Sequence, residues 1–284
     1  MKLYDERLCA LGEGPLWHPE RGQLFWFDIH GHCMLGRDGD EEQRWDFDKP
    51  VSAAGWINRD TLLVASSSGL LRLDLVSGCA DPVASLESDR PETRSNDGRA
   101  DPYGGFWIGT MGRKAEPGIG AIHRYYRGEV RTLFRGITIS NAIAFHPEGD
   151  MASFADTRTR VIQRVRLGAD GWPVGDPTPW IDLRAVGENP DGAVFDAEGH
   201  LWVALWGSGC VVRFSDEGTR IEELKLPVPQ PSCPTFGGDG VQTLFVTSAR
   251  EDMEDSALAA APQSGAVFSA PTDVPGLPEH KVLL

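Results

Sequence analysis

Six polar side chains share one place in a repeated pattern of the sequence, and their types could bind a hard cation. Two carry carboxylates, two carry carboxamides and two carry hydroxyls. Carboxylate and carboxamide oxygens, without sulfur or imidazole, suit a divalent cation, Ca²⁺ first, with Mg²⁺ or Mn²⁺ as alternatives. The six residues are Glu13, Ser52, Asn96, Asn141, Asp191 and Ser232.

The repeat that carries these residues is clearest between positions 189 and 226. Runs typical of strands, Ala193 to Asp196, Leu201 to Trp206 and Cys210 to Phe214, are separated by the turn sequences Ala-Glu-Gly-His and Gly-Ser-Gly, and a fourth run follows at Arg220 to Leu226. Short turns of this kind join adjacent antiparallel strands. One repeat is therefore a meander of four strands.

Six copies of this unit can be aligned on an aromatic or small residue that stands four positions after each polar side chain. Successive copies lie about forty to fifty residues apart, which is the period of four-stranded blades in a β-propeller. We therefore predict an all-β fold, a six-bladed β-propeller that forms a single domain over residues 1–284. The alignment positions are Trp17, Trp56, Ala100, Phe145, Phe195 and Phe236.

A closed ring of blades would gather the six polar residues at one mouth of a central channel, because each precedes the same point of an innermost strand. Taken singly, Asn-Asp-Gly at Asn96, Ser-Asn at Asn141 and Pro-Asp-Gly at Asp191 are ordinary turn sequences. Their common register is what favours a site. The segment Lys2 to Ala10 precedes the first copy, and we expect it to add the closing strand to the last blade.

Seven segments spread along nearly the whole chain form a further pattern: Leu11 to Trp17, Arg94 to Gly98, Phe106 to Met111, Ile139 to Asn141, Pro190 to Gly192, Leu201 to Ala204 and Cys233 to Gly238. In these segments the chain resembles the senescence marker protein/gluconolactonase/regucalcin family of metal-dependent sugar lactonases. The resemblance implies that Glu13, Asn141 and Asp191 bind one divalent metal, with Zn²⁺ and Fe²⁺ added to the candidate ions, and that Arg94, Asn96 and Glu116 face the substrate.

This resemblance implies a hydrolase that opens an aldonolactone ring to the aldonic acid. The metal would polarise the lactone carbonyl, and either Asp191 or the metal would activate the attacking water. Trp206 is a candidate apolar face for the sugar. Two other functions remain open: a related calcium-dependent phosphotriesterase or aryl esterase, and a propeller that binds calcium without catalysis.

Loop lengths also indicate which mouth is used. Connections between second and third strands are expected on the mouth with the polar ring, and most of them are short. Two are long, Gly112 to Gly120, which contains Glu116, and Ala249 to Gly265. Long loops on a rigid scaffold commonly carry function.

Several other classes of protein are disfavoured. A formal charge of −15 without a basic cluster argues against nucleic acid or an anionic membrane as partner. The N-terminus lacks a secretory signal, so we expect a cytoplasmic protein, and a monomer because a closed ring has no obligatory open edge. His18 should lie at the opposite end of its blade from His30 and His32, which argues against a zinc site, and Gly207-Ser208-Gly209 is not a nucleophile elbow.

Overall fold

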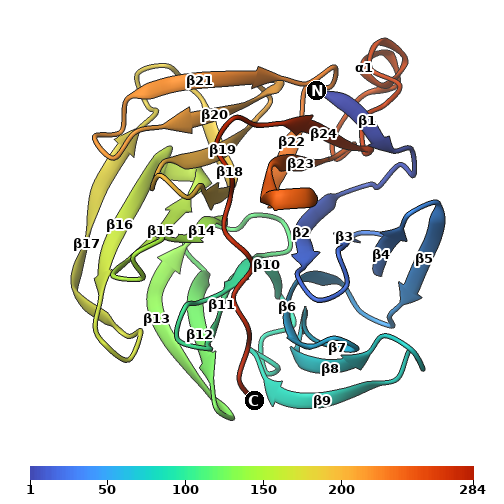
Figure 1. Cartoon of the computed structure of the whole chain (residues 1–284). Helices are drawn as coiled ribbons and strands as arrows, with labels where there is room; N and C mark the ends of the chain where they lie inside the picture. The colour runs from blue at the N-terminus through green and yellow to red at the C-terminus, as the bar shows by residue number, and fades with distance from the viewer.

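The computed structural model describes residues 1–284 and consists of six four-stranded antiparallel sheets arranged in a ring (Figure 1). Each sheet is one blade, so the predicted six-bladed β-propeller is confirmed. No helix is long and apolar enough to cross a membrane. The innermost strands of blades one to six are β2 (Gly12–His18), β6 (Val51–Asn58), β10 (Thr93–Ala100), β14 (Ser140–Phe145), β18 (Asn189–Phe195) and β22 (Pro231–Gly237).

The remaining strands follow outward in chain order within each blade. The second strands are β3 (Gln23–Asp28), β7 (Thr61–Ser66), β11 (Phe106–Gly112), β15 (Met151–Asp156), β19 (Leu201–Trp206) and β23 (Thr243–Ser248). The third strands are β4 (Cys33–Asp38), β8 (Gly69–Asp74), β12 (Gly120–Tyr126), β16 (Val161–Leu167), β20 (Cys210–Phe214) and β24 (Val267–Pro271). The outer strands are β5 (Glu41–Asp46), β9 (Ala80–Ser85), β13 (Glu129–Ile137), β17 (Pro173–Asp182), β21 (Arg220–Lys225) and, for blade six, β1 (Lys2–Asp5).

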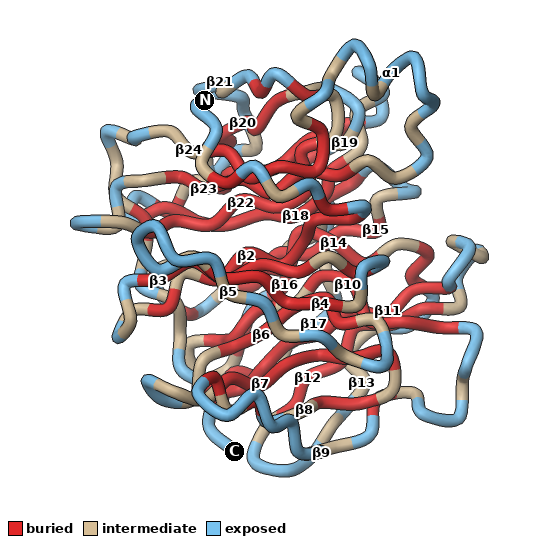
Figure 2. The backbone as a smooth tube through the Cα atoms, turned by 90° about the vertical axis from the view of Figure 1, so that its right-hand side faces the viewer, coloured by how far each residue is buried: buried red, intermediate tan, exposed pale blue.

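The hydrophobic core is divided among the six interfaces between neighbouring blades. One cluster of buried side chains lies at each interface, from Leu16 and Leu62 between blades one and two to Trp26 and Phe245 between blades one and six. Figure 2 shows the innermost strands in red, as buried chain, and exposed turns in blue at the periphery. Because every blade buries its faces only against its neighbours, the ring is stable only when it is closed.

The N-terminal strand closes the ring as predicted, and it also ties blade six to blade one. β1 pairs with β24 in blade six. The buried carboxylate of Asp5 binds Arg7 at 2.8 Å and Arg37 of blade one at 3.3 Å, and the Arg7 guanidinium donates to the carbonyl of Gly36. The closure therefore includes a buried ion pair beyond the strand pairing.

The C-terminal segment, residues 272–284, crosses the mouth of the channel where the innermost strands end (Figure 1). No repeat or motif predicted this crossing. The backbone of the segment bonds to blades two, three, five and six, including Val282 N–H to Trp56 O at 2.8 Å and Ala197 N–H to Pro275 O at 2.9 Å. Glu279 enters the channel and forms a buried ion pair with Arg99. This strap covers the mouth opposite the predicted polar ring.

Replacing Asp5 with Asn should destabilise the whole ring. The substitution leaves two guanidinium groups without their buried counter-charge, which costs about 3 kcal/mol of unfolding free energy. Urea unfolding should show one cooperative transition at a lower midpoint, whereas Asp48→Asn, at an exposed position, should leave the midpoint unchanged. Equal midpoints for both variants would contradict the clasp.

Candidate functional site

The innermost strands position the polar ring through a bulge that recurs in every blade. All six strands lose regular pairing with the second strand at or beside the ring residue, for example between Glu13 and Leu16 in β2 and between Pro190 and Ala193 in β18. The residues that follow Glu13 and Asn141 adopt positive φ, 52° at Gly14 and 53° at Ala142. Bulges redirect side chains, and here they direct them toward the channel.

One cavity of about 650 Å³ opens at this mouth and contains most of the predicted site. The structure brings together five of the six residues predicted to bind metal or polar groups of the substrate, which are Glu13, Arg94, Asn96, Asn141 and Asp191, and the candidate Trp206 also lines the cavity. The two hydroxyl members of the ring bond to neighbouring blades and do not line the cavity. Ser52 donates to Ser95 Oγ at 2.9 Å, and Ser232 donates to the carbonyl of Gly12.

The predicted substrate residue Glu116 lies outside the lining of the cavity. Its Oε2 atom accepts the backbone N–H of Lys114 at 3.0 Å, so its carboxylate faces its own loop. Contact between Glu116 and substrate therefore stays a prediction, and the contact that the structure contains is the one with Lys114 of the same loop. Both long loops do reach the cavity, through Arg113, Lys114, Glu251 and Asp252.

The two ring carboxylates are buried without an ion-pair partner. Glu13 accepts only the N–H of Gly14, at 3.2 Å, and Asp191 accepts no hydrogen bond from the protein. Burial, and next the charge of Asp97, raise the pKa of Glu13 to about 8. Burial, and next the charge of Glu13, raise the pKa of Asp191 well above its usual range. Such carboxylates call for a cation.

Hydrogen bonds to Thr157 and Asn96 fix the orientation of the Asn141 side-chain amide. Thr157 gives its single hydroxyl proton to the carbonyl of Pro190, at 2.7 Å. The Asn141 atom that meets Thr157 at 2.8 Å must therefore be the donor Nδ2, which leaves Oδ1 on the side of Asn96 and the channel. The oxygen is thus presented to the cavity that Glu13 and Asp191 also line.

Arg94 and Asn96 form a second layer around this group. Asn96 Oδ1 accepts Arg94 Nη1 at 2.6 Å, and its Nδ2 donates to Asn141 Oδ1 at 3.1 Å. The Asn96 oxygen is therefore occupied by Arg94. Arg94 uses only Nη1 for protein contacts, so its Nε and Nη2 remain available at the cavity.

Asp97 lies close enough to Glu13 and Asp191 for its charge to act on both, and the sequence pattern did not predict it as a site residue. It is 4% exposed, accepts the N–H of Ile143 at 2.8 Å, and has its pKa raised to about 6 chiefly by burial. In a regular strand, Asp97 would point away from its neighbour Asn96, but the bulge between Ser95 and Gly98 breaks that alternation. The Asn-Asp-Gly turn signal was the only trace of it in the sequence.

The charges and donors fit a divalent cation. When ionised, Glu13, Asp97 and Asp191 would carry three negative charges. Arg94 acts on Glu13 and Asp191, and Arg99, the cation that acts on Asp97, is already paired with Glu279. The excess is that of one dication. Glu13, Asn141 and Asp191 would supply its oxygen ligands, in agreement with the preference of hard cations.

A His30–Glu251 pair at the rim was also missed, because it joins two loops outside the repeat. His30 Nε2 lies 2.6 Å from Glu251 Oε1, and both side chains line the cavity. The expected separation of the N-terminal histidines is confirmed. His18 is the last residue of β2, at the end of the strand remote from the cavity, and its Nε2 lies 3.1 Å from the carbonyl oxygen of Asn58 in β6.

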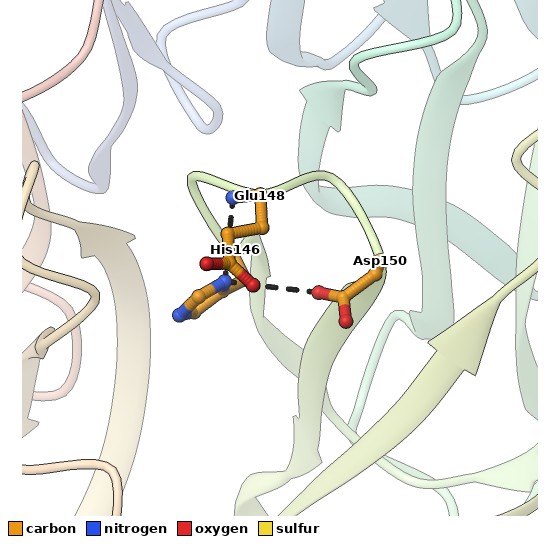
Figure 3. Close-up of side chains that lie close together, drawn as sticks. All are labelled: His146, Glu148 and Asp150. Carbon is orange, nitrogen blue, oxygen red and sulfur yellow. Dashed lines mark hydrogen bonds and ion pairs between the residues drawn. The ribbon is translucent and has the colours of Figure 1, made fainter.

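A second group of metal-type side chains lies at the opposite mouth. His146, Glu148 and Asp150 approach one another in the turn after β14 (Figure 3), a contact that the spacing of the histidines did not suggest. However, His146 Nδ1 accepts the N–H of Glu148 at 3.3 Å, and His18 accepts the N–H of Glu20 identically in blade one. The group is therefore explained as a repeated turn.

Fold and site together define a six-bladed propeller whose one open mouth holds buried oxygen atoms suited to a cation. The family described as SMP-30/Gluconolactonase/LRE-like region matches residues 11–250. The chain belongs to this family, which confirms the resemblance seen in the sequence.

Individual relatives cover almost the full chain. The 6-deoxy-6-sulfogluconolactonase of Pseudomonas putida is 33% identical, covering 98% of this chain and 97% of that protein. The L-arabinolactonase of Azospirillum brasilense is 34% identical, covering 94% of this chain and 90% of that protein. Among solved structures, a calcium-binding protein, regucalcin, from Agrobacterium tumefaciens has 40% identity and a TM-score of 0.98, covering 100% of this chain and 97% of that one.

The raised pKa of Glu13 predicts a pH-dependent loss of stability in metal-free protein. Between about pH 4.5 and pH 8 the folded state holds a proton that the unfolded state has released, so folding stability falls as pH rises through this window. With a chelator present, the urea midpoint of the parental protein should therefore fall between pH 5 and pH 8 by more than the midpoint of the Glu13→Gln variant does.

The control for this experiment is Glu20→Gln, at an exposed turn position, which should follow the parental pH profile. Adding a divalent cation should stabilise the parental protein more at pH 8 than at pH 5. A parental profile parallel to that of Glu13→Gln in chelator would contradict the assignment.

Proposed function

We propose that the protein is a metal-dependent hydrolase that opens the ring of a sugar lactone to the aldonic acid. The observation that carries the proposal is the pair of buried, unpaired carboxylates, Glu13 and Asp191, beside the oriented oxygen of Asn141 at a cavity with one open mouth. The names of the lactonase relatives, at 33% and 34% identity, support lactones as the substrate class.

Glu13, Asn141 and Asp191 would hold the cation, and Ca²⁺ is the first candidate because all ligands are oxygens. The calcium-binding relative supports this choice. When bound, the ion would supply Lewis acidity toward the lactone carbonyl and the attacking water.

The protein's own groups have separate roles in this proposal. Asp191, which no protein donor engages, would take a proton from the attacking water at its free carboxylate oxygen. The open Nε and Nη2 edge of Arg94 would bind adjacent oxygens of the sugar, since a guanidinium offers a fixed fork of donors. Trp206, half-buried at the wall, would cover an apolar face of the ring.

Replacing Asp191 with Asn should test the proposal most simply. The variant keeps the side-chain volume but loses a ligand charge and the proton acceptor, so turnover should fall by a factor of roughly a hundred or more at saturating metal. Hydrolysis of glucono-, galactono-, xylono- and arabinonolactones, corrected for spontaneous opening, is the measurement. Asp150→Asn, in the turn at the opposite mouth, should match the parental rate.

An Asp191→Asn protein that is folded, metal-loaded and as active as the parent would contradict the proposal. Parallel assays on aryl esters and phosphotriesters separate the alternative activity. Faster parental turnover of these esters than of every lactone would favour that alternative.

Asn96→Ala should separate substrate binding from metal binding. Its oxygen is engaged by Arg94, so metal affinity should stay within about threefold while kcat/KM for lactones falls at least tenfold. Isothermal titration with Ca²⁺ and steady-state kinetics measure the two effects. Loss of metal affinity as large as that of Asp191→Asn would assign Asn96 to the metal instead.

A further inference from the structure

The two long loops that border the cavity carry charges of opposite sign. The loop after β11 contributes Arg113 and Lys114, and the loop after β23 contributes Glu251 and Asp252. These loops belong to blades three and six, which stand across the ring from each other (Figure 1). The mouth is therefore positive on one side and negative on the other.

The negative side forms an ion pair within the protein, whereas the positive side forms none. Glu251 is paired with His30 at 2.6 Å. Lys114 makes no side-chain hydrogen bond or ion pair. Arg113 donates only Nε, to the carbonyl of Pro91 at 2.9 Å, which leaves its two terminal amino groups without a partner.

The metal site does not neutralise these cations either. A dication would balance Glu13, Asp97, Asp191 and Arg94 among themselves. Arg113 and Lys114 would then remain as cations of the cavity that no ion pair neutralises, in a protein whose net charge is −15. The carboxylate of Glu116 acts on the Lys114 side chain only through space. Local fields in a cleft, more than the net charge, govern which ions bind there.

The loop that presents the two cations is held in one shape. Arg113 N–H bonds to Glu92 O and Ala115 N–H bonds to Gly112 O, each at 2.9 Å, and Ala115 has a φ of 53°. Glu116 Oε2 accepts Lys114 N–H at 3.0 Å. Glu116 therefore acts as a positioning residue, and a fixed loop lowers the entropy lost when a ligand binds.

We infer that the substrate is a lactone bearing an anionic group, a carboxylate, sulfonate or phosphate, at the end of the sugar remote from the lactone carbonyl, and that this group binds Arg113 and Lys114. The inference rests on the proposed lactonase function. The reaction is unchanged, because water still adds to the lactone carbonyl and the anionic group takes no part. Arg113 would contribute paired donors and Lys114 a point charge, a combination suited to anionic oxygens.

The anionic group would also set the direction of binding. Like charges repel, so the side of Glu251 and Asp252 would reject it, while neutral hydroxyls can be accommodated there. The lactone carbonyl would then lie over Glu13, Asn141 and Asp191, and the charged end would point toward blade three.

The test compares kcat/KM for D-glucono-1,5-lactone with that for D-glucaro-1,4-lactone and 6-phospho-D-glucono-1,5-lactone in metal-loaded protein. The parental protein should favour at least one anionic lactone by about tenfold or more at low ionic strength, and less at 0.5 M salt, because exposed charges are screened. The two anionic substrates distinguish carboxylate from phosphate.

Arg113→Gln/Lys114→Gln should lower the ratio of anionic to neutral kcat/KM at least tenfold, mainly through KM. The control with the same charge change, Arg166→Gln/Lys225→Gln, should keep the parental ratio, because both residues are exposed and outside the cavity. Glu116→Ala should lower the ratio of anionic to neutral kcat/KM even though Arg113 and Lys114 are both present. Glu116→Gln should keep much of the parental ratio, since its amide oxygen can still accept the Lys114 N–H.

A parental ratio of one or less, or an unchanged ratio in Arg113→Gln/Lys114→Gln, would overturn the inference while leaving neutral lactone hydrolysis intact. Absence of hydrolysis of every lactone would overturn the proposed function and the inference together. The two failures are therefore distinguishable.

Discussion

The burial of three carboxylates against one guanidinium is the constraint on which the site depends. Glu13, Asp97 and Asp191 are each 4–5% exposed. Arg94 compensates Glu13 and Asp191, whereas Arg99, the cation that acts on Asp97, is itself paired with Glu279. Isolated buried charge is expensive, so a fold can hold this arrangement only where many other interactions fix the backbone. A counter-cation then gains affinity from charges that the protein has already desolvated.

The closed ring supplies that fixed backbone. Each innermost strand is held between two neighbouring blades, and β1 with Asp5 prevents the ring from opening between blades six and one. The C-terminal strap covers the other end of the channel, where Glu279 pairs with Arg99. The cavity is consequently approached from one side, and the two charged loops surround that approach.

The repeat made the fold and much of the site predictable from the sequence. Glu13, Asn141 and Asp191 share a register, and a period set by blade geometry brings them together without knowledge of any contact. Asp97 could not be found in this way, because the bulge that turns it toward its neighbours breaks the alternation of a regular strand. His30, Glu251 and the strap lie outside the repeat, so no periodic signal marks them, and the carboxylate of Glu116 faces its own loop through a contact that only coordinates reveal.

The central claim is that the buried oxygens of this mouth bind one divalent cation. The most direct measurement is a crystal structure of the protein grown with Mn²⁺, with anomalous difference maps recorded near the manganese absorption edge. The account predicts one strong peak within bonding distance of the Glu13 and Asp191 carboxylates and the Asn141 amide oxygen. A map with no peak at that position, or with its strongest peak at His146, Glu148 and Asp150, would contradict it.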